Sequence, residues 1–145
     1  MSGYPPIADL VPHAAPILML EALTRWEPGF AECGLVLRDS PEGPFAQAGF
    51  VDAVVTLEIM AQAVAACLGY EAYLGGAGVR VGMIVGCRRL ALQVDRLAVG
   101  TALVVTAQRQ TGDESVSRFQ CAVVGPEGPV ADASLTLFHA EHLPA

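Results

Sequence analysis

The chain has 145 residues, of which 53% are hydrophobic and 16% are charged. This length suits one domain with a sizeable core, and the hydrophobic share predicts further buried surface in an oligomer. The net charge of −7 argues against binding to nucleic acids and to anionic membrane surfaces.

The N-terminus, MSGYPPIADL, lacks the basic and apolar regions of a signal peptide. The apolar run over residues 51–68 contains Asp52, Glu58 and Gln62, which are costly inside a bilayer. The four cysteines are widely spaced and form no CxxC pair, which is typical of free cytoplasmic thiols and not of a metal or redox centre. We therefore expect a cytoplasmic protein without a membrane span.

The first third of the chain predicts two strands after a short irregular lead-in over residues 7–15. The strands cover residues 17–26 and 30–37, and the Pro-Gly pair between them marks a turn. Residues 39–49, DSPEGPFAQAG, are expected to form a Pro/Gly-rich loop.

A long helix is predicted to follow this loop, with Asp52 as a candidate cap and with Gly75-Gly76 ending it near Leu74. The helix is apolar almost all round, which is typical of a buried helix. Glu58 and Gln62 are four residues apart, so they share one face, about 6 Å apart along the axis. Such a carboxylate is either part of a satisfied polar pair in the core or an acid–base group, and we favour the second.

The second half of the chain predicts four strands, over residues 81–94, 102–110, 116–124 and 130–139. Short turns join the last three as antiparallel hairpins. One apolar helix among about six antiparallel strands requires a sheet that curves around it. We therefore predict an α+β hot-dog fold, a curved antiparallel sheet wrapped around one long central helix, as a single domain over residues 1–145.

All eight basic residues are arginines, and Arg80, Arg88, Arg89 and Arg96 lie within 17 residues of one another. Guanidinium groups form paired hydrogen bonds with carboxylates and phosphates, so this stretch is a candidate surface for an acidic carrier. For each single arginine, the alternative is a solvated strand residue.

Three segments, in this order, resemble the β-hydroxyacyl-acyl carrier protein dehydratases of the hot-dog superfamily. They are most similar to the divergent branch found with aryl-polyene and related polyketide-type clusters. The segments are Leu10-Val11-Pro12-His13 with PILMLE at 16–21, Glu58-Ile59-Met60-Ala61-Gln62-Ala63, and Gly82 to Val104. Common members carry a catalytic histidine in a Gly-His-Phe-Pro loop before the helix. This chain has FAQAGF over residues 45–50 there, without a histidine.

The resemblance implies dehydration of β-hydroxyacyl thioesters, held on the phosphopantetheine of an acyl carrier protein, to trans-2-enoyl thioesters. This reaction needs a base for the α-proton, an acid for the departing hydroxyl and donors to the thioester oxygen. Glu58 is the expected acid–base group, because an apolar pocket suits a carboxyl group to the acid role, and Gln62 is expected to orient it. His13 is the expected partner, able to act as base. The alternative is a structural role, because the corresponding Pro-His of common members is not their catalytic histidine. Gly82 and Gly86 are expected to let the pantetheine arm approach the backbone.

Backbone N–H groups at the start of the helix, over residues 51–54, are candidate donors to the thioester oxygen. No metal or organic cofactor is expected beyond the phosphopantetheine of the carrier protein or of CoA. The expected partners are an acyl carrier protein and further copies of the chain, as a homodimer or higher oligomer with acyl sites at the subunit interface. The alternatives are a hot-dog acyl thioesterase that uses Glu58 and a non-catalytic subunit that binds acyl chains or supports a catalytic partner.

Overall fold

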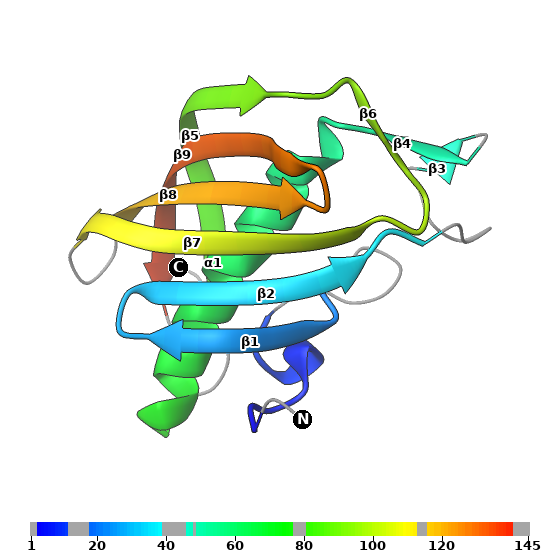
Figure 1. Ribbon diagram of the computed structural model, residues 1–145. Helices are drawn as coiled ribbons and strands as arrows, with labels where there is room; N and C mark the ends of the chain where they lie inside the picture. The colour runs from blue at the N-terminus through cyan, green and yellow to red at the C-terminus, as the bar shows by residue number, and fades with distance from the viewer. Residues whose placement is uncertain are drawn as a thin grey trace.

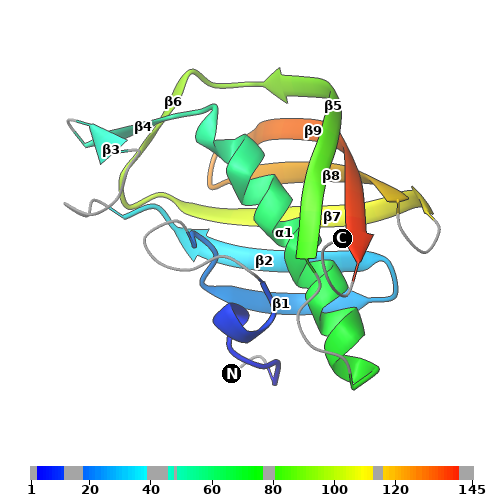
Figure 2. The ribbon, with the colours of Figure 1, turned by 180° about the vertical axis from the view of Figure 1, so that it is seen from behind.

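A computed structural model of the chain describes residues 3–11, 18–38, 46–47, 49–76, 81–112 and 116–140. Six antiparallel strands form a curved sheet in the order β1-β2-β7-β8-β9-β5, and helix α1 (Val55–Leu74) crosses its inner face (Figures 1 and 2). The strands are β1 Ala22–Glu27, β2 Phe30–Val36, β5 Val81–Leu92, β7 Ala102–Gly112, β8 Val116–Gly125 and β9 Gly128–Ala140. The predicted sheet around one long helix is confirmed.

The core lies between α1 and the inner face of the sheet. On β8, Phe119 and Cys121 are buried while Val116 and Gln120 are exposed, so the two faces of the strand alternate between core and solvent. The helix buries most of its apolar side chains against the sheet, including Ile59, Met60, Ala63, Val64, Ala66 and Cys67. The apolar composition of α1 is therefore explained by the curvature of the sheet, which covers more of the helix than a flat sheet would.

A second, three-stranded sheet lies at the N-terminal end of α1. It consists of β3 (Ala46–Gln47), β4 (Phe50–Asp52) and β6 (Arg96–Ala98), in the order β3-β4-β6. The prediction of a loop over residues 39–49 is therefore wrong at β3, and β4 and β6 were not predicted. Strands of two or three residues are too short for alternation to reveal them.

Two predicted element boundaries differ from the structure for identifiable reasons. The first strand begins at Ala22, and three residues before it the backbone N–H of Met19 donates to the side chain of Gln62 on α1. Asp52 accepts a hydrogen bond from the backbone N–H of Val54 at 2.9 Å, so it stabilises the turn before α1 and is not the N-cap, which is Val54. The end of the helix at Leu74 agrees with the prediction.

The N-terminal segment, defined here as residues 3–11 and 18–21, packs along α1. It contains a 3-10 turn, η1 (Ile7–Asp9), and the side chain of Leu10 is completely buried. The backbone of Leu10 lies directly on the helix at Gly69, where a Cβ atom would stand 1.7 Å from the Leu10 carbonyl oxygen. Only glycine fits at this point of the helix.

Aromatic side chains gather where the N-terminal segment, β1 and the second half of α1 meet. Tyr70 contacts Tyr4 and Trp26 edge-on, with ring centroids 5.1 and 5.0 Å away, and stacks on Tyr73 at 5.7 Å. The indole N–H of Trp26 donates to the carbonyl of Cys67, and its backbone N–H donates to the hydroxyl of Tyr4. These contacts fix one end of the N-terminal segment on α1.

Candidate active site

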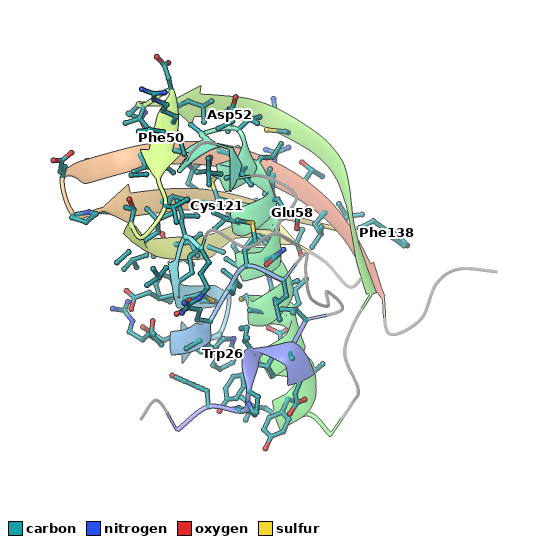
Figure 3. The ribbon with its side chains drawn as sticks, turned by 90° about the vertical axis from the view of Figure 1, so that its right-hand side faces the viewer. Trp26, Phe50, Asp52, Glu58, Cys121 and Phe138 are labelled. Carbon is teal, nitrogen blue, oxygen red and sulfur yellow. The ribbon has the colours of Figure 1, made fainter. Side chains whose placement is uncertain are left out.

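Glu58 lies on the first half of α1 (Figure 3), where it forms a hydrogen-bonded pair with Gln62. The Gln62 Nε2 group donates to Glu58 Oε2 at 2.9 Å, and Gln62 Oε1 accepts from the backbone N–H of Met19 at 2.8 Å. Gln62 is completely buried. The two side chains share one helix face, as their spacing predicted, and the backbone of the N-terminal segment is the third member of the chain of hydrogen bonds.

Glu58 itself is half-buried in this chain, and the expected dry site at a subunit interface stays a prediction. The apolar residues that cover α1 come from the sheet and from the N-terminal segment, and Glu58 is not part of this core. One turn before Glu58, the side chain of Val54 is 53% exposed. An apolar surface beside Glu58 is therefore left partly uncovered by the described residues.

His13 lies outside the described residues, so its role as the partner of Glu58 stays a prediction. The nearest described residues on either side are Val11 and Leu18. Val11 is buried, and Leu18 packs against the same core.

The two predicted glycines both lie on β5, which forms one edge of the large sheet. Gly82 pairs with His139 of β9, and Gly86 pairs with Thr136 beside a β-bulge. A Cβ atom at Gly86 would meet no atom of the described residues within 4 Å, apart from its two neighbours in the chain. The space at Gly86 is compatible with the approach of another molecule, and a role of Gly82 and Gly86 in binding stays a prediction.

The expected donors to the thioester oxygen are partly occupied within the chain. The backbone N–H of Ala53 donates to the carbonyl of Asp95 at 3.0 Å, and that of Val54 donates to the Asp52 carboxylate. These two groups therefore hold β4, β6 and the start of α1 together. They cannot at the same time serve a substrate in this arrangement.

The arginine-rich stretch forms an exposed surface in its described part. Arg88, Arg89 and Arg96 are exposed, and Arg80 lies outside the described residues. Arg89 lies 3.8 Å from the carboxylate of Asp132, and the guanidinium of Arg96 stacks on the ring of Phe50 at 4.0 Å. Binding of a carrier to this surface stays a prediction.

The four cysteines are free thiols, as predicted. Burial raises the pKa of Cys33, Cys67 and Cys121 to about 12, so these thiols stay protonated at neutral pH. Cys87 is exposed. The buried thiols are packing groups and not nucleophiles.

Sequence reasoning missed two groups that organise this region. Met19 acts through its backbone N–H, which leaves no signal in a side-chain pattern. Gly69 had a signal, because a glycine inside a helical pattern often marks a close approach of another segment. The close contact at Leu10 explains it.

Comparisons with known proteins identify the family. The model of the ApeP-like family, described as ApeP dehydratase, matches residues 5–145. The chain belongs to the ApeP-like dehydratase family. The reaction is therefore a dehydration, which confirms the predicted reaction class and the predicted superfamily. A comparison with curated proteins finds no match.

Solved structures confirm the hot-dog fold of this ApeP-like chain. The dehydratase heterocomplex ApeI:P from Xenorhabdus doucetiae matches with a TM-score of 0.86 at 24% identity, over 94% of this chain and 92% of that chain. Cj0977, a sigma28-regulated virulence protein from Campylobacter jejuni, matches with a TM-score of 0.70 at 14% identity, over 94% and 88%. A hypothetical thioesterase from Streptococcus pneumoniae, solved with coenzyme A, matches with a TM-score of 0.63 at 11% identity, over 82% and 84%. In the described part of the chain, no helix has the length and apolarity needed to cross a membrane.

Proposed function

We propose that this dehydratase acts on β-hydroxyacyl thioesters carried by an acyl carrier protein, in a polyketide-like synthesis in the cytoplasm. The observation that carries the proposal is the hydrogen-bonded series Met19–Gln62–Glu58, which holds a carboxylate in a fixed orientation on the central helix of a dehydratase fold. A carboxylate held in this way has the properties of an acid–base catalyst.

The reaction removes water from the substrate. The C2–H bond and the C3–O bond break, a C2–C3 double bond forms, and the hydroxyl leaves with a proton as water. We assign the two proton transfers to Glu58 and His13, one taking the α-proton and the other protonating the hydroxyl. Gln62 orients Glu58, and Gly82 and Gly86 admit the pantetheine arm. The chain needs no cofactor of its own in this proposal.

A second hot-dog chain completes the site. Glu58 is half-buried beside the exposed Val54, and the edge strand β5 has one side without a partner strand in the described residues. A second chain packed there would exclude water from Glu58, which strengthens electrostatic interactions with the reacting groups. The sequence favours a homodimer, and the existence of the ApeI:P heterocomplex supports a different hot-dog subunit as the alternative partner.

The test is the conversion of a β-hydroxyacyl carrier protein to the enoyl form, followed by mass spectrometry. We expect Glu58→Ala and His13→Ala each to lower the rate by roughly 100-fold or more, as the loss of a general acid or base does. Glu71→Ala is the matched control, because Glu71 lies on the same helix but pairs with Arg109. Unchanged turnover in both test variants would remove the assignment.

The same sample tests the thioesterase alternative, which the structural similarity to the hypothetical thioesterase from Streptococcus pneumoniae supports. A thioesterase releases a free thiol, and a dehydratase does not. The assay should use Cys87→Ser protein, because Cys87 is the exposed thiol of the chain. Thiol release at the rate of substrate loss would replace dehydration by hydrolysis.

A further inference from the structure

The hydrogen bonds of Gln62 determine which atom of its amide faces Glu58. The backbone N–H of Met19 can only donate, so the atom 2.8 Å away must be an acceptor, which is Oε1. The amide therefore presents its NH₂ group to Glu58 Oε2 at 2.9 Å. This orientation does not depend on the protonation of any side chain.

An N–H donor favours the ionised form of its carboxyl partner, because hydrogen bonds to a carboxylate are stronger than those to a neutral acid. The opposite amide orientation would let Oε1 accept the proton of a neutral Glu58. It would also bring the NH₂ group against the N–H of Met19, and two donors facing each other at a buried side chain are unfavourable. Met19 thus blocks the orientation that would stabilise a neutral Glu58.

The position of Glu58 in the helix acts in the same direction. Glu58 is the acidic residue of the first turn of α1. The partial positive charge at a helix N-terminus stabilises a carboxylate there. Two independent features, the donor from Gln62 and the helix N-terminus, therefore favour the charged form.

We propose that the Met19 backbone N–H and the Gln62 amide hold Glu58 as a carboxylate, so that Glu58 is the base that takes the α-proton. This inference rests on the proposed function and reverses the acid role that the sequence suggested for Glu58. The electron pair of the C2–H bond forms the new double bond as the C3–O bond breaks. The proton for the leaving hydroxyl then comes from the conjugate acid of His13. Met19 and Gln62 are positioning groups, and Glu58 is the catalytic residue.

The first test needs no substrate. The carboxyl of Glu58 is titrated by ¹³C NMR and assigned with Glu58→Gln protein. The Met19 amide is then replaced by a backbone ester, which deletes only this N–H, and we expect the titration midpoint of Glu58 to rise by about one pH unit. The same replacement at Glu21, whose N–H donates to the carbonyl of Gly34, is the matched control and should leave the midpoint unchanged.

A second variant covers the case in which the ester protein does not fold. Gln62→Met removes the donor to Glu58 with little change in volume, and the midpoint should again rise. A midpoint that stays in place, or falls, in either folded variant overturns the proposal. Because the titration involves no substrate, its outcome is independent of whether the chain dehydrates a carrier-bound thioester.

The second test asks which group moves the α-proton. With the β-hydroxyacyl carrier protein in deuterated water, we expect His13→Ala to retain exchange at C2 while it loses dehydration, and Glu58→Gln to lose both. Exchange that survives in Glu58→Gln and disappears in His13→Ala would assign the base to His13 and overturn the proposal. Absence of dehydration and exchange in the wild-type protein, with a normal NMR result, would instead count against the proposed substrate.

Discussion

At the scale of single residues, Gln62 joins the N-terminal segment to Glu58, the proposed catalytic carboxylate. Its two polar atoms are both used, one by Met19 and one by Glu58. The spacing of Glu58 and Gln62 predicted their pairing, because residues four apart on a helix are neighbours. The Met19 contact was not predictable, because the donor is a backbone group 43 residues away along the chain.

Replacement of Gln62 should therefore affect stability as well as activity. We expect Gln62→Leu to lower the free energy of unfolding by about 1–3 kcal/mol, since it leaves the Met19 N–H without its partner. Urea denaturation measures the effect. Gln120→Leu, on the exposed face of β8, is the control and should change stability by less than about 0.5 kcal/mol. Equal effects of the two variants would show that the Met19 contact adds nothing to the free energy of unfolding.

The buried thiols predict how stability depends on alkaline pH. The pKa of Cys33, Cys67 and Cys121 is about 12 in the folded protein, against 9.0 for an unperturbed thiol. Below pH 9 the thiols are protonated in both states, and their contribution to stability is complete. Above pH 9 the unfolded chain ionises first, so stability falls as pH rises towards 12, by up to about 1.4 kcal/mol per thiol and pH unit.

Denaturation curves between pH 8 and 11 measure this slope. The chain contains no lysine, so no ammonium side chain titrates in the same range. Cys121→Ala should reduce the slope, whereas Cys87→Ala, at the exposed thiol, should leave it unchanged. A slope that is the same in Cys121→Ala as in the wild type would contradict the protonated state of that thiol.

At the scale of elements, α1 is both the centre of the core and the support of the N-terminal segment. The long elements were predictable, because α1 and the six strands of the large sheet are long enough to show apolar periodicity. The sheet β3-β4-β6 was not predictable, because its strands are two or three residues long and β4 pairs with the sequence-distant β6. The close contact between the backbone of Leu10 and Gly69 is likewise a tertiary contact that no local pattern specifies.

We expect this contact to reverse the usual stabilising effect of a glycine-to-alanine substitution in a helix. Helix propensity alone predicts that Gly69→Ala stabilises the protein by about 1 kcal/mol. The new Cβ atom would stand 1.7 Å from the Leu10 carbonyl oxygen, so the N-terminal segment must move and the buried Leu10 must lose contacts. We expect a net loss of about 2–4 kcal/mol, measured by chemical denaturation.

Gly34→Ala is the matched control for this substitution. A Cβ atom there would lie 3.8 Å from the methyl group of Thr24, which is an ordinary contact. We expect its stability to stay close to that of the wild type. A gain in stability for Gly69→Ala would show that the N-terminal segment does not depend on the contact at Gly69.

At the scale of the whole molecule, the half-buried Glu58 and the exposed Val54 predict that the active form is an assembly. We expect Val54→Arg to shift the protein towards the monomer and to lower dehydration by at least tenfold, because a charge there opposes apolar packing beside Glu58. Light scattering after size exclusion measures the mass. Val116→Arg replaces a similarly exposed valine on the outer face of β8, and it should change neither the molecular mass nor the dehydration rate. A monomeric wild-type protein with full activity alone would refute this prediction.

The sequence predicts more of the fold than of the candidate site. Element order and hydrophobic pattern were enough for a sheet around one helix, because burial depends on patterns repeated over many residues. The environment of Glu58 could not be predicted in the same detail, since an apolar sequence around a carboxylate does not tell which side of the helix the sheet leaves open. That side depends on how the sheet curves.

The aromatic cluster gives this protein a built-in optical label. Trp26 is the only tryptophan, and Tyr4 and Tyr70, two of the three tyrosines, have their ring centroids close to it or to each other. Emission excited at the tryptophan band therefore comes from the one junction where the start of the chain meets the far half of α1. A change in that emission before the loss of helical circular dichroism would separate local release of the N-terminal segment from global unfolding, without any added dye.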